Sequence, residues 1–244
     1  MNHPGYAIVD NSRIQKAKKI IACLEYIMGE RFKDKKVLEI GGGSCLISYE
    51  ISKLENEVIC TDLKDETFQE TIDKCNIQNH VNFLIADGRK LPFKHSSFDI
   101  VIANQVLEHV PKMDHQKLID ESYRVLKTGG LFYVATPNKL WPIEPHTKLP
   151  FLSYLPPGLA NKYIKLTKGV DKYDVYLLTY NQLKDLTLTK FKTLINLTPI
   201  IIKNPETFYI KSEIPNLLKS LLEIVPLNIL WLLNLSYPSW ILVG

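Results

Sequence analysis

Short β-type runs alternate with helical stretches between residues 36 and 135 of this 244-residue chain. The β-type runs are apolar along most of their length, which is typical of parallel strands that are buried on both faces. Parallel neighbours cannot be joined by a tight turn, so each return needs a crossover helix. The sequence therefore predicts an α/β fold, a doubly wound parallel sheet with helices on both faces. The predicted strands span residues 36–40, 57–61, 81–86, 98–103 and 131–135, and the predicted helices span 44–54, 64–75 and 113–126.

The pattern changes after residue 137. Residues 138–178 are rich in proline and aromatic residues and are too long for a plain connection, so they predict an insertion. The rest of the chain is expected to contain a helix over 180–190, a long strand over 191–203, a very apolar second insertion over 204–236 and a last strand over 239–243.

A basic amphipathic helix over residues 10–29 precedes the alternating region. We expect the whole chain, residues 1–244, to form a single domain. Its predicted parts are an N-terminal helix or lid at 1–30, a ligand-binding core at 36–137, and two cap insertions at 138–178 and 204–236.

The charge balance of the chain argues against one class of obligatory partner. The chain has 30 Lys and Arg residues and 26 Asp and Glu residues, and the net charge of +4 is too small to predict nucleic-acid binding. Hydrophobic residues make up 45% of the chain, which is enough to bury a core and to exclude disorder as the main state. The first residues lack the basic and apolar regions of a secretory signal, so we expect a cytoplasmic location.

Four cysteines, Cys23, Cys45, Cys60 and Cys75, occur without any CxxC pair. Because no Cys/His ligand spacing is present either, the sequence predicts no metal site. Four free thiols are consistent with a reducing compartment.

Glycines and polar side chains follow four of the predicted strands at the point where each strand ends. Ligands of open α/β sheets bind at this edge, so these residues are expected to form one site. Glycines let the backbone approach a ligand closely, and an acidic residue after the second strand can accept hydrogen bonds from ribose hydroxyls. Neither a complete dinucleotide glycine motif nor a P-loop motif is present, which favours a nucleoside without phosphates. The residues are Gly41, Gly42, Gly43, Asp62, Asp87, Gly88 and Asn104.

Successive segments of the chain resemble, in order and spacing, the motifs of the class I S-adenosylmethionine-dependent methyltransferases. The resemblance is greatest to the type 11 branch, which is similar to the quinone-biosynthesis methyltransferases. It implies a Rossmann-like, seven-stranded sheet whose last strand runs antiparallel, and S-adenosylmethionine as the cofactor. Cys45 departs from the family pattern, because it replaces the last glycine of the first motif. The segments are VLEIGGGSC (37–45), Asp62, IADGRKLPF (85–93), FDIVIANQVLEHV (98–110) and YRVLKTGGLFYVATPN (123–138).

The same resemblance implies roles at the methionine end of the cofactor. Glu39 would order the glycine loop and the amino end of the methionine moiety, and Gly41 and Gly43 would lie beside that moiety. Asn104 would offer its backbone carbonyl to the amino group. The N-terminal helix is expected either to close over the cofactor, with Tyr6 or Arg13 reaching its carboxylate, or to present a solvated basic face.

At the other end of the cofactor, the resemblance implies contacts with the ribose and with adenine. Asp62 would bind the ribose hydroxyls, and Leu63 would pack on the adenine ring. Asp87 and Gly88 would contact the edge of the adenine, although Asp87 is also a common turn residue.

Methyl transfer is a direct in-line displacement that requires no metal but needs a base if the acceptor is a hydroxyl. The candidate bases are His109, just past the fourth strand, and Glu144 and His146 in the first insertion. His109 also fits a structural or cofactor-side role, and His146 also fits a capping role in a rigid loop. Trp141, Glu144 and His146 are expected to line the acceptor pocket.

Both insertions are apolar, which suits a small hydrophobic or lipid-linked acceptor, unless the two insertions only bury each other. The stretch 214–235 is too interrupted to span a membrane but suits peripheral contact with lipid. We therefore predict a methyltransferase that acts on a hydroxyl oxygen. Two alternatives stay open, namely C-methylation of a quinone-type ring and a non-catalytic, membrane-docked scaffold that binds the cofactor.

Overall fold

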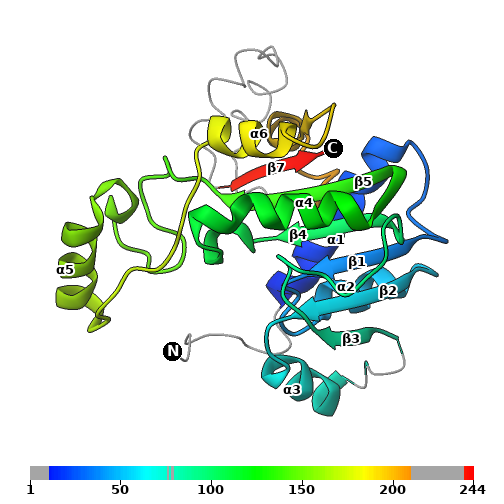
Figure 1. The fold of residues 1–244 in the computed structure, drawn as a ribbon, viewed down its shortest axis with the longest axis horizontal. Helices are drawn as coiled ribbons and strands as arrows, with labels where there is room; N and C mark the ends of the chain where they lie inside the picture. The colour runs from blue at the N-terminus through cyan, green and yellow to red at the C-terminus, as the bar shows by residue number, and fades with distance from the viewer. Residues whose placement is uncertain (1–10, 76, 78–79, 210–238) are drawn as a thin grey trace.

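The computed structural model describes residues 11–75, 77, 80–209 and 239–244. Within these residues, seven strands form one sheet in the order β3-β2-β1-β4-β5-β7-β6 (Figure 1). The neighbours from β3 to β5 are parallel, whereas β7 is antiparallel to both β5 and β6. The strand order reverses between β1 and β4, where open α/β sheets bind their ligands. The bounds are β1 Lys36–Ile40, β2 Glu57–Asp62, β3 Asn82–Ile85, β4 Phe98–Asn104, β5 Leu126–Pro137, β6 Ile195–Asn196 and β7 Ser239–Val243.

Helices cover both faces of the sheet, because successive residues of a strand point to opposite faces. The described helices are α1 Asn11–Met28, α2 Leu46–Ser52, α3 Glu66–Cys75, α4 His115–Val125, α5 Pro157–Lys168, α6 Tyr180–Leu188 and α7 Thr198–Lys203. In β4, Ile100 and Ile102 pack in one core with α1, α2 and α7, whereas Val101 and Ala103 pack in another with α4 and α6. In Figure 1, α4 lies in front of the sheet and α1 lies behind it. The predicted α/β class, with helices on both faces, is confirmed.

The predicted long strand over 191–203 is wrong. Only Ile195–Asn196 forms a strand, and Thr198–Lys203 forms the short helix α7. Pro199 lies in the first turn of α7, where its missing N–H group is tolerated. The Asn196 side chain accepts a hydrogen bond from the Thr198 N–H at 3.0 Å and so helps the chain to turn into the helix. The apolar run in this segment is a helix face, and run length alone does not distinguish it from a buried strand.

The predicted insertion at 138–178 contains the 3-10 turn η4, Leu152–Tyr154, and helix α5. Helix α5 stands away from the sheet, at the left of Figure 1. The second predicted insertion, 204–236, and the apolar stretch 214–235 fall largely or wholly outside the described residues. None of the helices in the described part of the chain combines the length and the apolar character that crossing a membrane requires.

Cys45 and Cys60 form a disulfide, so the prediction of four free thiols is wrong. Cys60 lies in β2 beside Glu39 of β1. The loop after β1 turns toward β2, because the N–H groups of Gly41 and Gly42 both donate to the Thr61 carbonyl, at 2.7 and 3.1 Å. This turn brings the two sulfurs together, a contact that spacing along the sequence does not reveal. The inference of a reducing compartment from free thiols loses its basis.

Candidate functional site

The glycine loop that follows β1 has a backbone that few other residues can adopt. Gly41 has φ +66° and Gly43 has φ +55°, in the left-handed region where a Cβ atom is disfavoured. A Cβ atom on Gly41 would lie only 2.7 Å from Val106 Cγ2. A Cβ atom on Gly42 would overlap Cys60 Sγ and lie 3.0 Å from Glu39 Oε2. The loop is therefore packed tightly at Gly41 and Gly42, whereas at Gly43 the φ angle alone favours glycine.

Asp62 ends β2 and connects that strand to the glycine loop. Its Oδ2 atom accepts a hydrogen bond from the Gly43 N–H at 2.8 Å, and its Oδ1 atom accepts one from the Leu63 N–H at 2.7 Å. A carboxylate can accept about four hydrogen bonds, so Asp62 keeps capacity for two hydroxyl donors. The next side chain, Leu63, is 64% exposed and offers an apolar surface at the same edge of the sheet.

Glu39 is a buried carboxylate beneath the glycine loop. Its Oε2 atom accepts hydrogen bonds from the N–H of Ser48 at 3.0 Å and from the hydroxyl of the same residue at 2.5 Å. Burial raises the pKa of Glu39, whereas these hydrogen bonds and the nearby Arg13 oppose the rise. Glu39 therefore ties β1 to α2 and supports the loop between them, which agrees with its predicted ordering role.

Helix α1 covers one side of the glycine loop with two basic side chains. Arg13 Nη1 donates to Ser44 Oγ at 2.9 Å and lies 3.8 Å from the position of a Cβ atom on Gly43. Lys16 Nζ donates to Gln105 Oε1, also at 2.9 Å. The sequence singled out Arg13 but missed Lys16, because its partner Gln105 lies just past β4 and far away along the chain.

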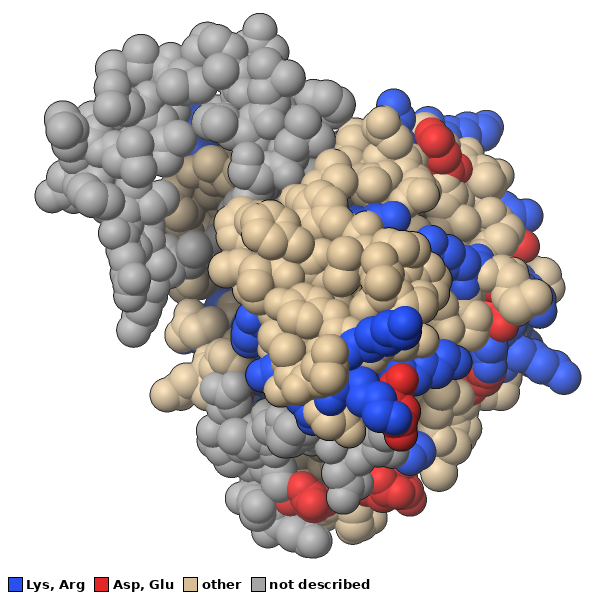
Figure 2. Space-filling model, turned by 90° about the vertical axis from the view of Figure 1, so that its left-hand side faces the viewer, with Lys and Arg blue, Asp and Glu red and all other residues tan. Residues whose placement is uncertain are grey.

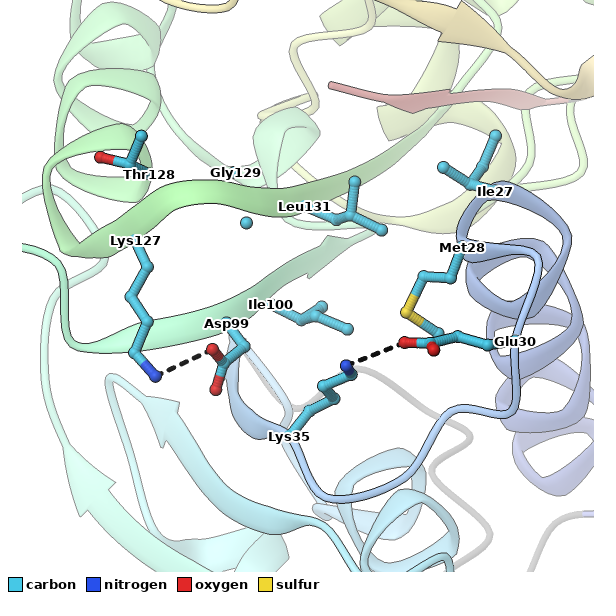
Figure 3. A pocket seen from close by; sticks show the side chains of 11 residues that line it. Ile27, Met28, Glu30, Lys35, Asp99, Ile100, Lys127, Thr128, Gly129 and Leu131 are labelled. Carbon is cyan, nitrogen blue, oxygen red and sulfur yellow. Dashed lines mark hydrogen bonds and ion pairs between the residues drawn. The ribbon is translucent and has the colours of Figure 1, made fainter.

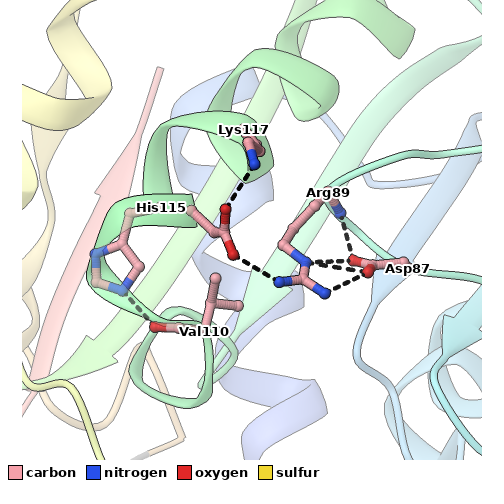
Figure 4. Close-up of polar contacts among 6 residues, drawn as sticks. Asp87, Arg89, Val110, His115 and Lys117 are labelled. Atoms are coloured by element: carbon pink, nitrogen blue, oxygen red, sulfur yellow. Dashed lines mark hydrogen bonds and ion pairs between the residues drawn. The ribbon is translucent and has the colours of Figure 1, made fainter.

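Asp87 lies in a salt-bridge network that sequence reasoning missed. Arg89 donates to both Asp87 carboxylate oxygens through Nε, at 2.9 and 3.0 Å, and through Nη2, at 2.6 Å. Arg89 also donates to Asp114 at 2.7 Å, which Lys117 contacts in turn (Figure 4). The hydrogen bonds from Arg89 hold the pKa of Asp87 below its usual value. An adenine amine would therefore share this carboxylate with Arg89, and the only sequence signal was an Arg two residues after the Asp.

Gly88 and Asn104, two further predicted site residues, lie at the same carboxyl edge of the sheet. Gly88 packs so closely on β1 that a Cβ atom there would lie 2.6 Å from Ile40 Cγ2. Asn104 is the last residue of β4, and the next residue, Gln105, has φ +58° and donates its N–H to the Ala135 carbonyl at 2.7 Å. This turn directs the chain back across the end of β1, where Val106 meets Gly41.

Glu108, His109 and His146 gather beyond the end of β4. The first two lie in the 3-10 turn η2, Leu107–His109, and the third comes from the 138–178 insertion. The rings of His109 and His146 have centroids 5.1 Å apart, and His146 Nε2 lies 4.0 Å from Glu108 Oε1. Burial raises the pKa of Glu108 to about 8. The structure thus brings together both predicted histidines and adds Glu108, which the sequence did not single out.

Glu144, a predicted candidate base and pocket residue, is buried. Its Oε2 atom accepts hydrogen bonds from the Thr147 N–H and, at 2.7 Å, from the Thr147 hydroxyl, which closes the loop that carries His146. Burial together with the nearby Glu144 raises the pKa of Tyr173. Trp141, the remaining residue of the predicted pocket wall, is half-buried at the start of this loop. Glu144 is therefore best described as a support for His146.

A pocket of about 330 Å³ lies at the opposite edge of the sheet, near the beginning of β4 and β5. Figure 3 shows its charged side chains in pairs, Lys127 with Asp99 at 2.8 Å and Lys35 with Glu30 at 3.0 Å. None of the predicted site residues lines it. The carboxyl edge of the sheet is the better candidate site.

Part of the chain matches a known protein family. Residues 38–134 match the family model described as a methyltransferase domain. This segment of the chain is similar to the methyltransferase domains of the class I S-adenosylmethionine-dependent methyltransferases, in their type 11 branch. The chain is 32% identical over 108 residues to a ubiquinone/menaquinone biosynthesis C-methyltransferase of Pasteurella multocida, a match that covers 42% of this chain and 40% of that protein. It is 27% identical over 168 residues to a ubiquinone biosynthesis O-methyltransferase of Bartonella bacilliformis, a match that covers 63% of this chain and 67% of that protein.

Solved structures show the same fold as this chain. A protein from Pyrococcus horikoshii superposes on this chain with a TM-score of 0.62 at 15% sequence identity. The superposition covers 97% of this chain and 92% of that protein. An S-adenosylmethionine-dependent methyltransferase from Mesorhizobium loti gives a TM-score of 0.57 at 13% identity, with 91% and 95% covered. The chain spans less than half the length of several curated relatives that it matches.

The residues at the carboxyl edge of the sheet fit S-adenosylmethionine, the cofactor of this family. The absence of a Cβ atom at Gly43 leaves the backbone of the loop accessible beside Arg13 and Asp62, as a closely approaching ligand requires. Asp62 retains acceptor capacity beside the loop, and the exposed Leu63 offers an apolar surface next to it. The predicted family and cofactor are confirmed.

Proposed function

We propose that this protein transfers a methyl group from S-adenosylmethionine to a hydroxyl oxygen of a small or lipid-linked acceptor. One observation carries the proposal: the cluster of Glu108, His109 and His146 lies just past β4, and the turn that leads to it packs on the glycine loop through Val106 and Gly41. When bound, the cofactor supplies an activated methyl group on a sulfonium and the leaving thioether. The chain must then hold the acceptor oxygen in line with that methyl group and exclude water.

The cofactor contacts that we propose follow the edge of the sheet. Gly41 and Gly43 lie beside the methionine moiety, with Glu39 beneath them and the Asn104 carbonyl toward the amino group. Asp62 binds the ribose with the acceptor capacity that its two backbone hydrogen bonds leave free. Leu63 packs on the adenine, and Asp87 and Gly88 meet the edge of that ring. Gly42, in the same loop, is the remaining proposed cofactor contact.

Removing Arg13 is expected to weaken cofactor binding modestly, because we propose that its guanidinium pairs with the cofactor carboxylate. Arg13→Ala removes one partly exposed ion pair, worth about 0.5–1 kcal/mol, so the Kd for S-adenosylmethionine should rise roughly two- to fivefold. Isothermal titration calorimetry measures this change. Arg31→Ala is the matched control, because it removes the same charge from an exposed position outside the site. Equal Kd values for the two variants would contradict the pairing.

The acceptor end of the site suits oxygen as the methylated atom. A neutral imidazole can accept the proton that a hydroxyl loses when it is methylated. His109 and His146 both reach solvent, so an acceptor can approach them, whereas Glu108 behind them is buried. The first insertion supplies His146 and, with Trp141, the proposed wall of the acceptor pocket.

Large apolar side chains on the first insertion favour a hydrophobic or lipid-linked acceptor. Phe151, Tyr154, Leu159 and Leu166 are all exposed, and Leu166 is exposed by 87%. Figure 2 views the molecule from the side on which α5 lies and shows Lys and Arg side chains beside an uncharged surface. An apolar surface next to lysines suits the boundary of an anionic lipid layer. We therefore propose peripheral contact with lipid on this face, in addition to the predicted contact through 214–235.

Carbon is the second candidate for the methylated atom, and two of the curated relatives favour it. The relative in Pasteurella multocida is named as a C-methyltransferase, and a cycloartenol C-24-methyltransferase of Arabidopsis thaliana is 36% identical over 103 residues. These matches cover 40% and 30% of those proteins.

Transfer of a ¹³C-labelled methyl group distinguishes the two candidates. The protein is incubated with ¹³C-methyl-labelled S-adenosylmethionine and a lipid extract, and the products are examined by NMR after organic extraction. We expect a labelled methoxy carbon in the organic phase. A label bonded to carbon would instead support C-methylation, and a label confined to water-soluble products would contradict a lipid-linked acceptor.

A further inference from the structure

Three side chains of metal-ligand type meet at the acceptor end of the site. Glu108, His109 and His146 each offer one ligand atom, and these atoms all lie within 4.8 Å of one another. The histidine rings are tilted by 76° to each other, and His146 Nε2 lies 4.0 Å from Glu108 Oε1. Such a separation leaves room for a cation between atoms that are too far apart to hydrogen-bond.

The carboxylate of this cluster is the observation that points to a ligand. Glu108 is fully buried, and its Oε1 atom finds no hydrogen-bond donor among the described residues. A buried carboxylate oxygen without a partner is costly. A cation held between Oε1 and the two imidazoles would remove this cost.

The surroundings hold Glu108 in place. Its Oε2 atom accepts a hydrogen bond from the Thr136 hydroxyl at 3.2 Å, and its carbonyl accepts one from the Tyr176 N–H at 2.7 Å. Outer hydrogen bonds of this kind orient the ligands of metal sites. On the other side, Glu144 and Thr147 fix the loop that carries His146. Both walls of the cluster are therefore ordered by the chain itself.

We propose that Glu108, His109 and His146 bind one divalent cation of the first transition row, such as Zn²⁺. One carboxylate and two imidazoles are a ligand set that such cations accept, and a set of three protein ligands leaves a coordination position open. The sequence predicted no metal site, because the spacing of Cys and His residues shows no metal-binding pattern. The site depends on the fold, which brings the first insertion to the end of β4.

The open position gives the cation a role that rests on the proposed function. A hydroxyl bound there becomes more acidic and is held at a fixed point. In the transfer, the O–H proton leaves to water or to a free base, and its electron pair stays on the oxygen. An electron pair of that oxygen then forms the bond to the methyl carbon, while the electron pair of the carbon–sulfur bond remains on sulfur. With the cation bound, the two histidines hold the acceptor indirectly, as ligands.

Zn²⁺ binding to the full chain tests the site without any acceptor. The untagged protein is freed of metal with a chelator and titrated with Zn²⁺ by calorimetry, and Co²⁺ is then used as a spectroscopic probe of the ligand geometry. We expect one equivalent of Zn²⁺ per chain and a Co²⁺ spectrum typical of mixed nitrogen and oxygen ligands. Glu108→Gln and His146→Ala should each weaken binding by roughly tenfold or more. His95→Ala, at an exposed position outside the cluster, should bind as the unaltered protein does.

Two outcomes overturn the site: no stoichiometric Zn²⁺ binding by the unaltered chain, or equal binding by the Glu108→Gln and His146→Ala variants. Glu108→Gln keeps the size of the buried side chain, and His146 reaches solvent, so circular dichroism should show both variants folded. Failure of the proposed function gives a different result. In that case Zn²⁺ binds as expected, but no methyl label reaches any acceptor.

Discussion

Replacement of His146 by alanine is expected to lower the turnover number by roughly 100-fold or more and to leave the affinity for S-adenosylmethionine unchanged. His146 acts on the acceptor and on the chemical step in either proposed role, as the proton acceptor of a metal-free site or as a ligand of the bound cation. The side chain comes from the first insertion and packs against His109, whereas the proposed cofactor contacts come from the ends of β1, β2, β3 and β4. Loss of the imidazole should therefore lower the turnover number without changing the affinity for the cofactor.

Steady-state kinetics with the acceptor found by label transfer, together with calorimetry for the cofactor, measure both quantities. His95→Ala is the matched control, because it removes an exposed histidine from a turn far from the insertion. Unchanged turnover in His146→Ala would show that the ring only packs against His109. A large loss of cofactor affinity would show instead that the insertion supports the cofactor end as well.

Replacement of Asp62 by alanine is expected to weaken S-adenosylmethionine binding by about 1.5–3 kcal/mol, roughly 10- to 150-fold. Two losses contribute to this effect. The variant lacks the proposed hydrogen bonds from the ribose hydroxyls to a charged acceptor. It also lacks the 2.8 Å hydrogen bond from the Gly43 N–H, which holds the glycine loop against β2.

Asp62→Asn separates the two losses. Its side-chain carbonyl can still accept the Gly43 N–H bond, but the amide group cannot accept a second ribose hydroxyl. Its Kd should therefore lie between those of the unaltered protein and of Asp62→Ala in calorimetry. Glu70→Ala, which removes one exposed carboxylate from α3, is the control for net charge. Binding by Asp62→Ala that equals that of Glu70→Ala would eliminate Asp62 as the ribose ligand.

The cofactor half of the site could be predicted from the sequence because its residues occur at strand ends. Gly41, Asp62, Asp87 and Asn104 each follow a buried apolar run, and parallel strands bring all their carboxyl ends to one edge. Glu39 is also part of a strand, and its predicted support of the glycine loop agrees with its contacts to Ser48. Their positions follow from the apolar runs along the chain and from the rule that parallel strands share one carboxyl edge.

Contacts between distant segments could not be predicted in the same way. The Cys45–Cys60 disulfide depends on how the glycine loop turns toward β2, and the pair of Lys16 and Gln105 depends on how α1 crosses the sheet. Arg89 is only two residues from Asp87, yet its second partner, Asp114, comes from the turn before α4. Side-chain partners of this kind follow from packing, which a pattern along the chain does not encode.

The sequence by itself determined the α/β class and a ligand site at the strand ends, because hydrophobic periodicity and glycine and acidic residues at strand ends are local properties of the chain. Its resemblance to the motifs of a known family indicated the methyltransferase family and the cofactor. Only the tertiary structure decided the acceptor end. There, the turn after β4 brings Glu108 and His109 to His146 of the first insertion, and burial leaves one Glu108 oxygen without a hydrogen-bond donor among the described residues. Burial and contact between remote segments arise only when the chain is folded, so the role of Glu108 appears first in three dimensions.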